Sequence, residues 1–123
     1  MPRSGLSSPV ELYQGLADGF PMLPTYRRHL AAALGNLATA QKSLGRFPDA
    51  EDTDSRAIRL AQQLVVDFPQ VPDYRKDLAQ HRYNLGILLR AAGRPRDAEQ
   101  AYRAALPIAA AVVSRYARAP CRT

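Results

Sequence analysis

The sequence contains no tryptophan, two histidines and one cysteine, Cys121. A single cysteine excludes an internal disulfide and any zinc site that needs several cysteines. The two histidines show no metal-ligand spacing, so we expect neither a metal nor another cofactor. Valine and isoleucine are few while alanine is abundant, and this balance favours helices over sheets.

Long apolar runs are also missing. The longest run, 104–113, contains Pro107, whereas a membrane-spanning helix needs about 20 consecutive apolar residues. The first residues, 1–5, lead into no apolar segment of signal-peptide length. We therefore expect a cytoplasmic chain with no membrane partner.

The charge is unevenly distributed along the chain. There are 17 Lys and Arg against 11 Asp and Glu, which gives a net charge of +6. Residues 68–115 hold eight basic and four acidic residues, whereas residues 20–67 are nearly balanced. The basic second half makes an RNA-binding helical repeat protein the alternative function. No run of aromatic residues interleaved with arginine is present for base stacking, and this argues against a nucleic-acid partner.

The chain matches itself when it is shifted by 48 residues. Residues 20–67 and 68–115 then share 17 identities. The identical segments include Phe-Pro at 20 and 68, Tyr-Arg at 26 and 74, Asn-Leu at 36 and 84, Gly-Arg at 45 and 93, and Asp-Ala-Glu at 49 and 97. Such self-similarity is the signature of a repeat architecture. We divide the chain into an N-terminal segment carrying the second helix of a partial repeat (1–19), repeat one (20–67), repeat two (68–115) and a basic C-terminal tail (116–123).

Apolar residues recur every three or four positions within each unit, which is the spacing of one helical face. We expect an all-α chain in which neighbouring helices pack antiparallel. The expected helices, about five in number, lie near 8–18, 26–44, 48–67, 74–92 and 96–115.

Several residues predict how these helices begin and end. Thr25 and Asp73 are expected to be N-caps, because their side-chain oxygens can accept from the first turn. Gly45 and Gly93 are expected to adopt a left-handed conformation just after a helix. Pro107 is expected to kink or interrupt the last helix, because proline lacks a backbone donor.

The small and large residues of each unit occur at characteristic spacings. In the second unit they are Asn84-Leu85-Gly86, Gly93, Ala98, Tyr102 and Ala105, and in the first Asn36-Leu37, Gly45, Phe47, Ala50 and Ala57. This pattern resembles the tetratricopeptide repeat family. The family period is about 34 residues, so a period of 48 is similar to the long-period arrays of bacterial multi-repeat and kinase-linked proteins. The kinase signatures themselves are missing, so no catalytic role carries over.

Two positions of the first unit depart from this pattern. Ala38 stands where the second unit has Gly86, and Asp54 stands where it has Tyr102.

The resemblance implies a fragment of an α-solenoid, in which the first helices of stacked hairpins line a concave groove. The groove positions that it implies are Asn36, Thr39, Lys42, Gln80, Tyr83, Asn84, Ile87 and Arg90. Asn36 and Asn84 could each donate to and accept from a peptide backbone, or instead join adjacent helices. Lys42 and Arg90 could bind a carboxylate, or simply face solvent.

We therefore expect a scaffold or adaptor that binds a peptide or partner protein in this groove. Catalysis is not expected, because the residues form no catalytic constellation, and His29 and His81 are expected at the surface or the groove edge. The end helices lack neighbours, so we also expect a homo-oligomer, in the simplest case a dimer, formed through their apolar faces.

Overall fold

The structure is a computed structural model that describes the backbone of residues 8–118 and the side chains of residues 8–106. This part of the chain contains five α-helices and no strand. The helices are α1 (Pro9–Gly19), α2 (Pro24–Ser43), α3 (Phe47–Asp67), α4 (Pro72–Ala91) and α5 (Pro95–Arg118). The prediction of an all-α chain is confirmed. Cys121 lies outside the described residues.

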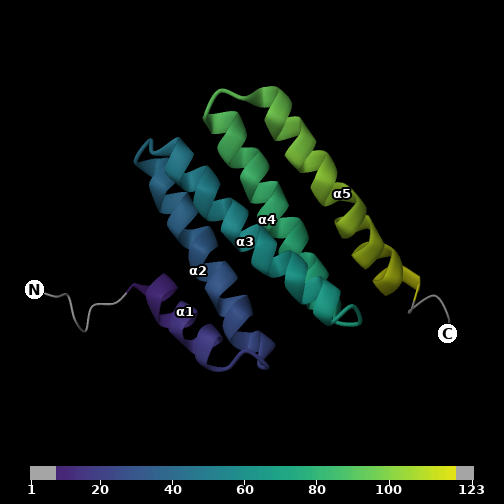
Figure 1. Ribbon diagram of the computed structural model, residues 1–123. Coiled ribbons are helices and arrows are strands. Elements are labelled where there is room, and N and C mark those ends of the chain that lie inside the picture. Colours follow the sequence, from purple (N-terminus) through teal and green to yellow (C-terminus); the bar gives the residue numbers. More distant parts are fainter. Residues whose placement is uncertain (1–7, 119–123) are drawn as a thin grey trace, which may run out of the picture.

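The helices form two antiparallel hairpins and one additional helix (Figure 1). Helix α2 pairs with α3 and α4 pairs with α5, while α3 also packs against α4 and joins the two hairpins. Helix α1 packs against α2 at one end of the array. The largest fully buried side chains are Leu30, Leu34 and Leu64, from α2 and α3. The hydrophobic core therefore follows the row of helices, as expected where each hairpin packs against its neighbours.

Helices α2 and α4 begin at Pro24 and Pro72, each in the first turn. Proline suits this position because its fixed φ is helical and its missing N–H would have no partner there. The predicted N-caps Thr25 and Asp73 are wrong, because both residues lie inside their helices and neither N-cap residue makes a side-chain hydrogen bond. Among α1 to α4, only α1 has a side-chain cap, a capping box between Ser8 and Glu11.

The connections α2–α3 and α4–α5 are alike. Gly45 and Gly93 have φ of +76° and +82°, which confirms the predicted left-handed residues. The arginine after each glycine binds an aspartate in the next helix, and Arg94 also contacts Glu51 of α3 with an N–O distance of 2.6 Å. The two hairpins are thus fixed to each other at this end of the array.

Helix α5 differs from the prediction in two respects. The expected interruption at Pro107 is wrong, because α5 is a single helix from Pro95 to Arg118. A kink at this residue stays a prediction. One missing backbone hydrogen bond is a small part of a helix of 24 residues, and the turns on either side maintain it. The helix also continues to Arg118, into the segment predicted as a tail.

A close contact fixes α4 against α5. A Cβ atom placed on Gly86 would clash with Cε1 of Tyr102, so the tyrosine ring rests directly on the glycine backbone. The same ring lies 5.2 Å from the ring of Tyr83. Gly86 therefore allows an aromatic side chain of the second helix to contact the first.

We expect Gly86→Ala to destabilise the protein, because the added methyl group must displace the Tyr102 ring. Such overpacking typically costs about 1–3 kcal/mol, more than the gain in helix propensity of about 1 kcal/mol. Urea denaturation followed by circular dichroism measures the change. Ala38→Gly, at the equivalent position of α2, is the matched control and should show only the propensity cost. A Gly86→Ala variant more stable than the parent would contradict this account of the contact.

Candidate partner-binding groove

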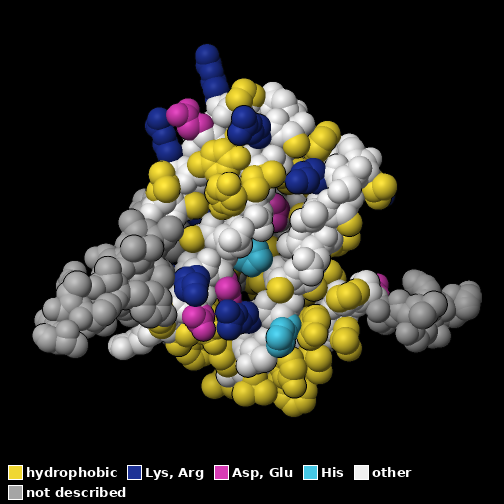
Figure 2. Space-filling model, turned by 180° about the vertical axis from the view of Figure 1, so that it is seen from behind, with side chains coloured by type: hydrophobic (Ala, Val, Ile, Leu, Met, Phe, Trp, Pro, Cys, Tyr) yellow, Lys and Arg dark blue, Asp and Glu magenta, His cyan; other side chains and the backbone are white. Residues whose placement is uncertain are grey.

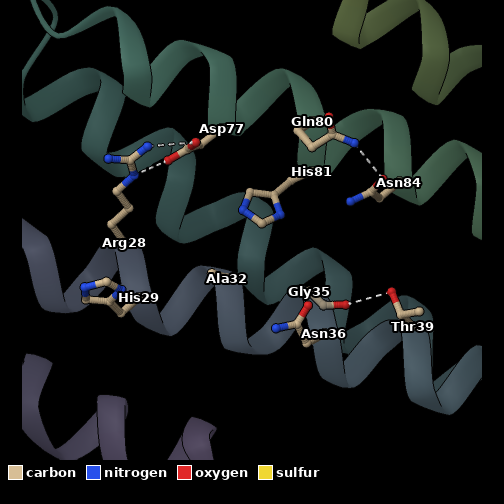
Figure 3. A pocket seen from close by; sticks show the side chains of 10 residues that line it. All are labelled: Arg28, His29, Ala32, Gly35, Asn36, Thr39, Asp77, Gln80, His81 and Asn84. Atoms are coloured by element: carbon tan, nitrogen blue, oxygen red, sulfur yellow. Dashed lines mark hydrogen bonds and ion pairs between the residues drawn. The ribbon is translucent and has the colours of Figure 1, made fainter.

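A groove runs between α2 and α4, the first helices of the two hairpins. Its main cavity has a volume of about 410 Å³. The lining residues, drawn in Figure 3, are Arg28, His29, Ala32, Gly35, Asn36 and Thr39 from α2, with Asp77, Gln80, His81 and Asn84 from α4. In the space-filling view from behind, both histidine side chains are visible on one hollowed face, where basic and acidic side chains lie close together (Figure 2).

One end of this cavity is fixed by an ion pair between Arg28 and Asp77. The guanidinium donates to both carboxylate oxygens, with an Nη2–Oδ1 distance of 3.2 Å. These hydrogen bonds raise the pKa of Arg28. The guanidinium carbon also lies 5.7 Å from the centre of the Tyr74 ring. This pair links α2 to α4 and neutralises the charge at this end of the cavity.

The predicted asparagines face the same cavity from opposite helices (Figure 3). Asn84 Oδ1 accepts from Gln80 Nε2 at 2.9 Å, within α4. Among the described residues no side-chain hydrogen bond joins Asn36 or Asn84 to a neighbouring helix, so the structural alternative for this pair is not observed. Each amide therefore retains hydrogen-bonding groups that a bound peptide could use.

His81 is a groove residue whose burial the sequence analysis missed. Its side chain is only 9% exposed, and its ring lies against Gly35 across the cavity. Burial lowers the pKa of His81, while the nearby Asp77 opposes this shift. The alignment of the two repeats could have indicated this burial, because His81 aligns with Ala33, which is buried. His29, in contrast, is exposed as predicted and stacks on Tyr13 at 5.2 Å.

A second, smaller cavity of about 80 Å³ adjoins the first, because Thr39 and Asn84 line both. Its other lining residues are Ala38, Lys42, Asp54, Ile87 and Leu88. We call it the Asp54 pocket. Asp54 is 2% exposed, and burial raises the pKa of its carboxyl to about 6, although the charge of Lys42 opposes this shift.

The predicted site residues are thus largely brought together. Asn36, Thr39, Gln80 and Asn84 line the main cavity, and Lys42 and Ile87 line the Asp54 pocket. Tyr83 and Arg90 line neither of these two cavities. Tyr83 packs against Tyr102 of α5, and Arg90 is exposed near the end of α4. The burial of Asp54 was not anticipated, although its alignment with a packed aromatic residue was visible in the sequence.

Some arginine side chains of the basic second half form ion pairs within the chain. Arg94 contacts Glu51 and Asp97, and Arg103 contacts Glu99 at 3.0 Å. These pairs reduce the positive charge that this half presents to a partner. In the described part of the chain, no helix is both long and apolar enough to cross a membrane.

Comparison with known families completes this description. Residues 78–115, within α4 and α5, match the family model described as tetratricopeptide repeat. No curated protein and no solved structure matches the chain. The match covers most of the hairpin in which Tyr102 rests on Gly86. The α2–α3 hairpin is built in the same way, because a glycine with positive φ connects its two helices and they pack against each other. The long-period bacterial subtype stays a prediction. The match over residues 78–115 supports assigning the chain to the tetratricopeptide repeat family.

Proposed function

We propose that this chain is a protein-interaction module, a scaffold or adaptor, whose groove between α2 and α4 binds a segment of a partner protein. Tetratricopeptide repeats are generally protein–protein interaction modules and are typically not enzymes. The observation that carries the proposal is the cavity shared by the first helices of both hairpins. Stacked helical hairpins characteristically use this concave side for binding.

The chemistry of the groove suits a peptide backbone. Asn36 and Asn84 present amide groups from opposite walls, and each can both donate and accept. The Arg28–Asp77 pair is internally neutralised, so neither sign of charge dominates that end. A partner segment that crosses between the asparagines would find hydrogen-bonding partners on both sides.

The test is a double variant, Asn36→Ala/Asn84→Ala, in capture of partners from the native lysate. We expect the variant to fold normally and to bind a partner of the parent chain about tenfold or more weakly, because two hydrogen bonds are lost. Gln63→Ala/Gln100→Ala removes two exposed amides outside the groove and is the matched control. Undiminished capture of every partner by a folded groove variant would show that the groove is not the binding site.

The same preparations separate this function from RNA binding. A mobility shift with random RNA at two salt concentrations would show tight, steeply salt-dependent binding if the basic half contacted phosphates. We expect weak binding instead, because ion pairs already engage Arg94 and Arg103.

Cytoplasmic location and self-association remain part of the proposal. At the α1 end the exposed apolar residues are Leu12, Phe20, Met22 and Leu23. An apolar surface of this kind is typical of an interface. The opposite end of the array, beyond Leu106, lies outside the described side chains.

A further inference from the structure

The two hairpins differ at one packing contact, and this difference creates the Asp54 pocket. In the α4–α5 hairpin the Tyr102 ring rests on Gly86. The two corresponding residues, 48 positions earlier, are Asp54 in α3 and Ala38 in α2. An aspartate side chain is much shorter than a tyrosine side chain. The space beside α2 is therefore left as a cavity of about 80 Å³ instead of being filled by a ring.

One oxygen of the buried carboxylate in this pocket has no hydrogen-bond partner. Asp54 is 2% exposed, and its Oδ1 atom has no hydrogen-bond donor within the described chain. Lys42 is close enough to influence it electrostatically, but no ion pair between them is found among the described residues. A buried carboxylate without donors is unfavourable in the unbound protein. A donor group that enters the pocket would offset this cost.

Two further oxygens surround the pocket. Thr39 donates its hydroxyl hydrogen to the Gly35 carbonyl at 3.1 Å, so its oxygen remains available as an acceptor. Asn84 Oδ1 already accepts from Gln80 Nε2, and a carbonyl oxygen has a second lone pair. The remaining lining residues are Lys42 and three apolar side chains, those of Ala38, Ile87 and Leu88. The pocket thus combines several acceptors with one cationic and three apolar side chains.

We propose that the Asp54 pocket receives a lysine side chain of the partner segment. This inference rests on the proposed function, because the pocket adjoins the groove between α2 and α4. A lysine ammonium group has three donors, which match Asp54, Thr39 and Asn84, and its methylene stem can contact the apolar side chains of Ala38, Ile87 and Leu88. An acidic side chain would instead meet the buried carboxylate and be repelled.

The test uses a short peptide, acetyl-Gly-Lys-Gly-amide, titrated into the full chain and followed by amide chemical shifts. The same peptide with norleucine replaces the ammonium group by a methyl group and keeps the stem. We expect saturable shifts at Thr39, Asn84 and Ile87 with the lysine peptide only. Equal shifts with the norleucine peptide would overturn the proposal, as would no shift with either peptide.

Variants of the pocket separate charge from shape. Asp54→Asn keeps the shape and should weaken binding of the lysine peptide about tenfold or more, because a charge-assisted hydrogen bond is lost. Lys42→Gln removes a like charge from the pocket lining and should tighten binding of the lysine peptide. If Lys42→Gln abolished binding, or if Asp54→Asn bound as well as the parent, the pocket would not recognise a lysine. Binding of a glutamate peptide in place of the lysine peptide would also overturn the proposal.

A third variant fills the pocket in the way that the second hairpin does. Ala38→Gly/Asp54→Tyr is expected to keep the helical circular dichroism and to lose peptide binding. If it does not fold, Asp54→Asn still decides the question. If Asn36→Ala/Asn84→Ala loses partner capture but the parent does not bind the lysine peptide, the lysine pocket is rejected and the groove remains the binding site. If the double variant captures every partner and the parent binds the lysine peptide, the groove is rejected and the lysine pocket remains.

Discussion

Replacing Leu34 by alanine is expected to lower the free energy of unfolding by about 2–5 kcal/mol, a large part of the stability of a small domain. Leu34 is 0% exposed and lies in a cluster with Ala17, Leu30, Ala31 and Ala57. This cluster joins α1, α2 and α3, so one side chain supports three helices. Three of the buried residues in this cluster, Ala17, Ala31 and Ala57, are alanines, whose side chains are too short to fill the cavity left by the substitution.

The matched control is Leu44→Ala, just after α2, where the leucine is 73% exposed. We expect this variant to differ from the parent by no more than about 0.5 kcal/mol, as is usual for exposed positions. Urea denaturation followed by circular dichroism measures both. Similar effects of the two substitutions would show that the α1–α2–α3 cluster does not carry the stability of the array. An effect of Leu34→Ala confined to α1 would mean that the chain does not unfold as one unit.

The sequence predicted the helices well because their signal is local. Apolar spacing and the glycines at 45 and 93 both act within one or two turns. The wrong N-caps at Thr25 and Asp73 also come from local signals. At each helix start a proline directly precedes a residue with a capping side chain, and either residue could begin the helix. In both helices the proline defines the first turn.

The site was harder to predict because burial depends on the neighbouring hairpin. Asp54 and His81 are polar residues of amphipathic helices, and a single helix gives no reason to bury them. Each is buried because of what lies opposite, which is Gly35 for His81 and α4 for Asp54. The alignment of the two repeats indicated this burial. Asp54 aligns with Tyr102 and His81 aligns with Ala33, and both tyrosine and alanine suit packed positions.

Asp54→Asn is expected to change the pH dependence of stability. Burial raises the pKa of Asp54 in the folded state to about 6, above the ordinary value of 3.8. The folded state therefore binds the proton more tightly than the unfolded state. This stabilisation is fully present below pH 3.8 and is lost as the pH rises through about 6. Over that window the shift corresponds to about 2–3 kcal/mol.

The measurement is the difference in free energy of unfolding between Asp54→Asn and the parent, from pH 8 to pH 4. We expect this difference to favour the variant more at pH 8 than at pH 4, by about 2–3 kcal/mol. Asp52→Asn removes the same charge from an exposed position of α3 and controls for net charge. A difference that does not change with pH would contradict the burial of an ionised Asp54.

Other groups also titrate between pH 4 and pH 8, so the free energy of unfolding of the parent alone does not isolate Asp54. The difference between Asp54→Asn and the parent does. Burial lowers the pKa of His81, so its contribution to stability is lost as the pH falls below about 6.5, opposite in sign to that of Asp54. Lys42 is the other charged residue that lines the pocket, and α4 contributes only Asn84, Ile87 and Leu88 there. Subtracting the parent's free energy of unfolding from that of Asp54→Asn removes the contribution of His81.

If a partner's lysine binds Asp54, the bound ammonium group supplies the missing donors. The lysine ligand should therefore stabilise the parent at pH 8 and leave Asp54→Asn nearly unaffected.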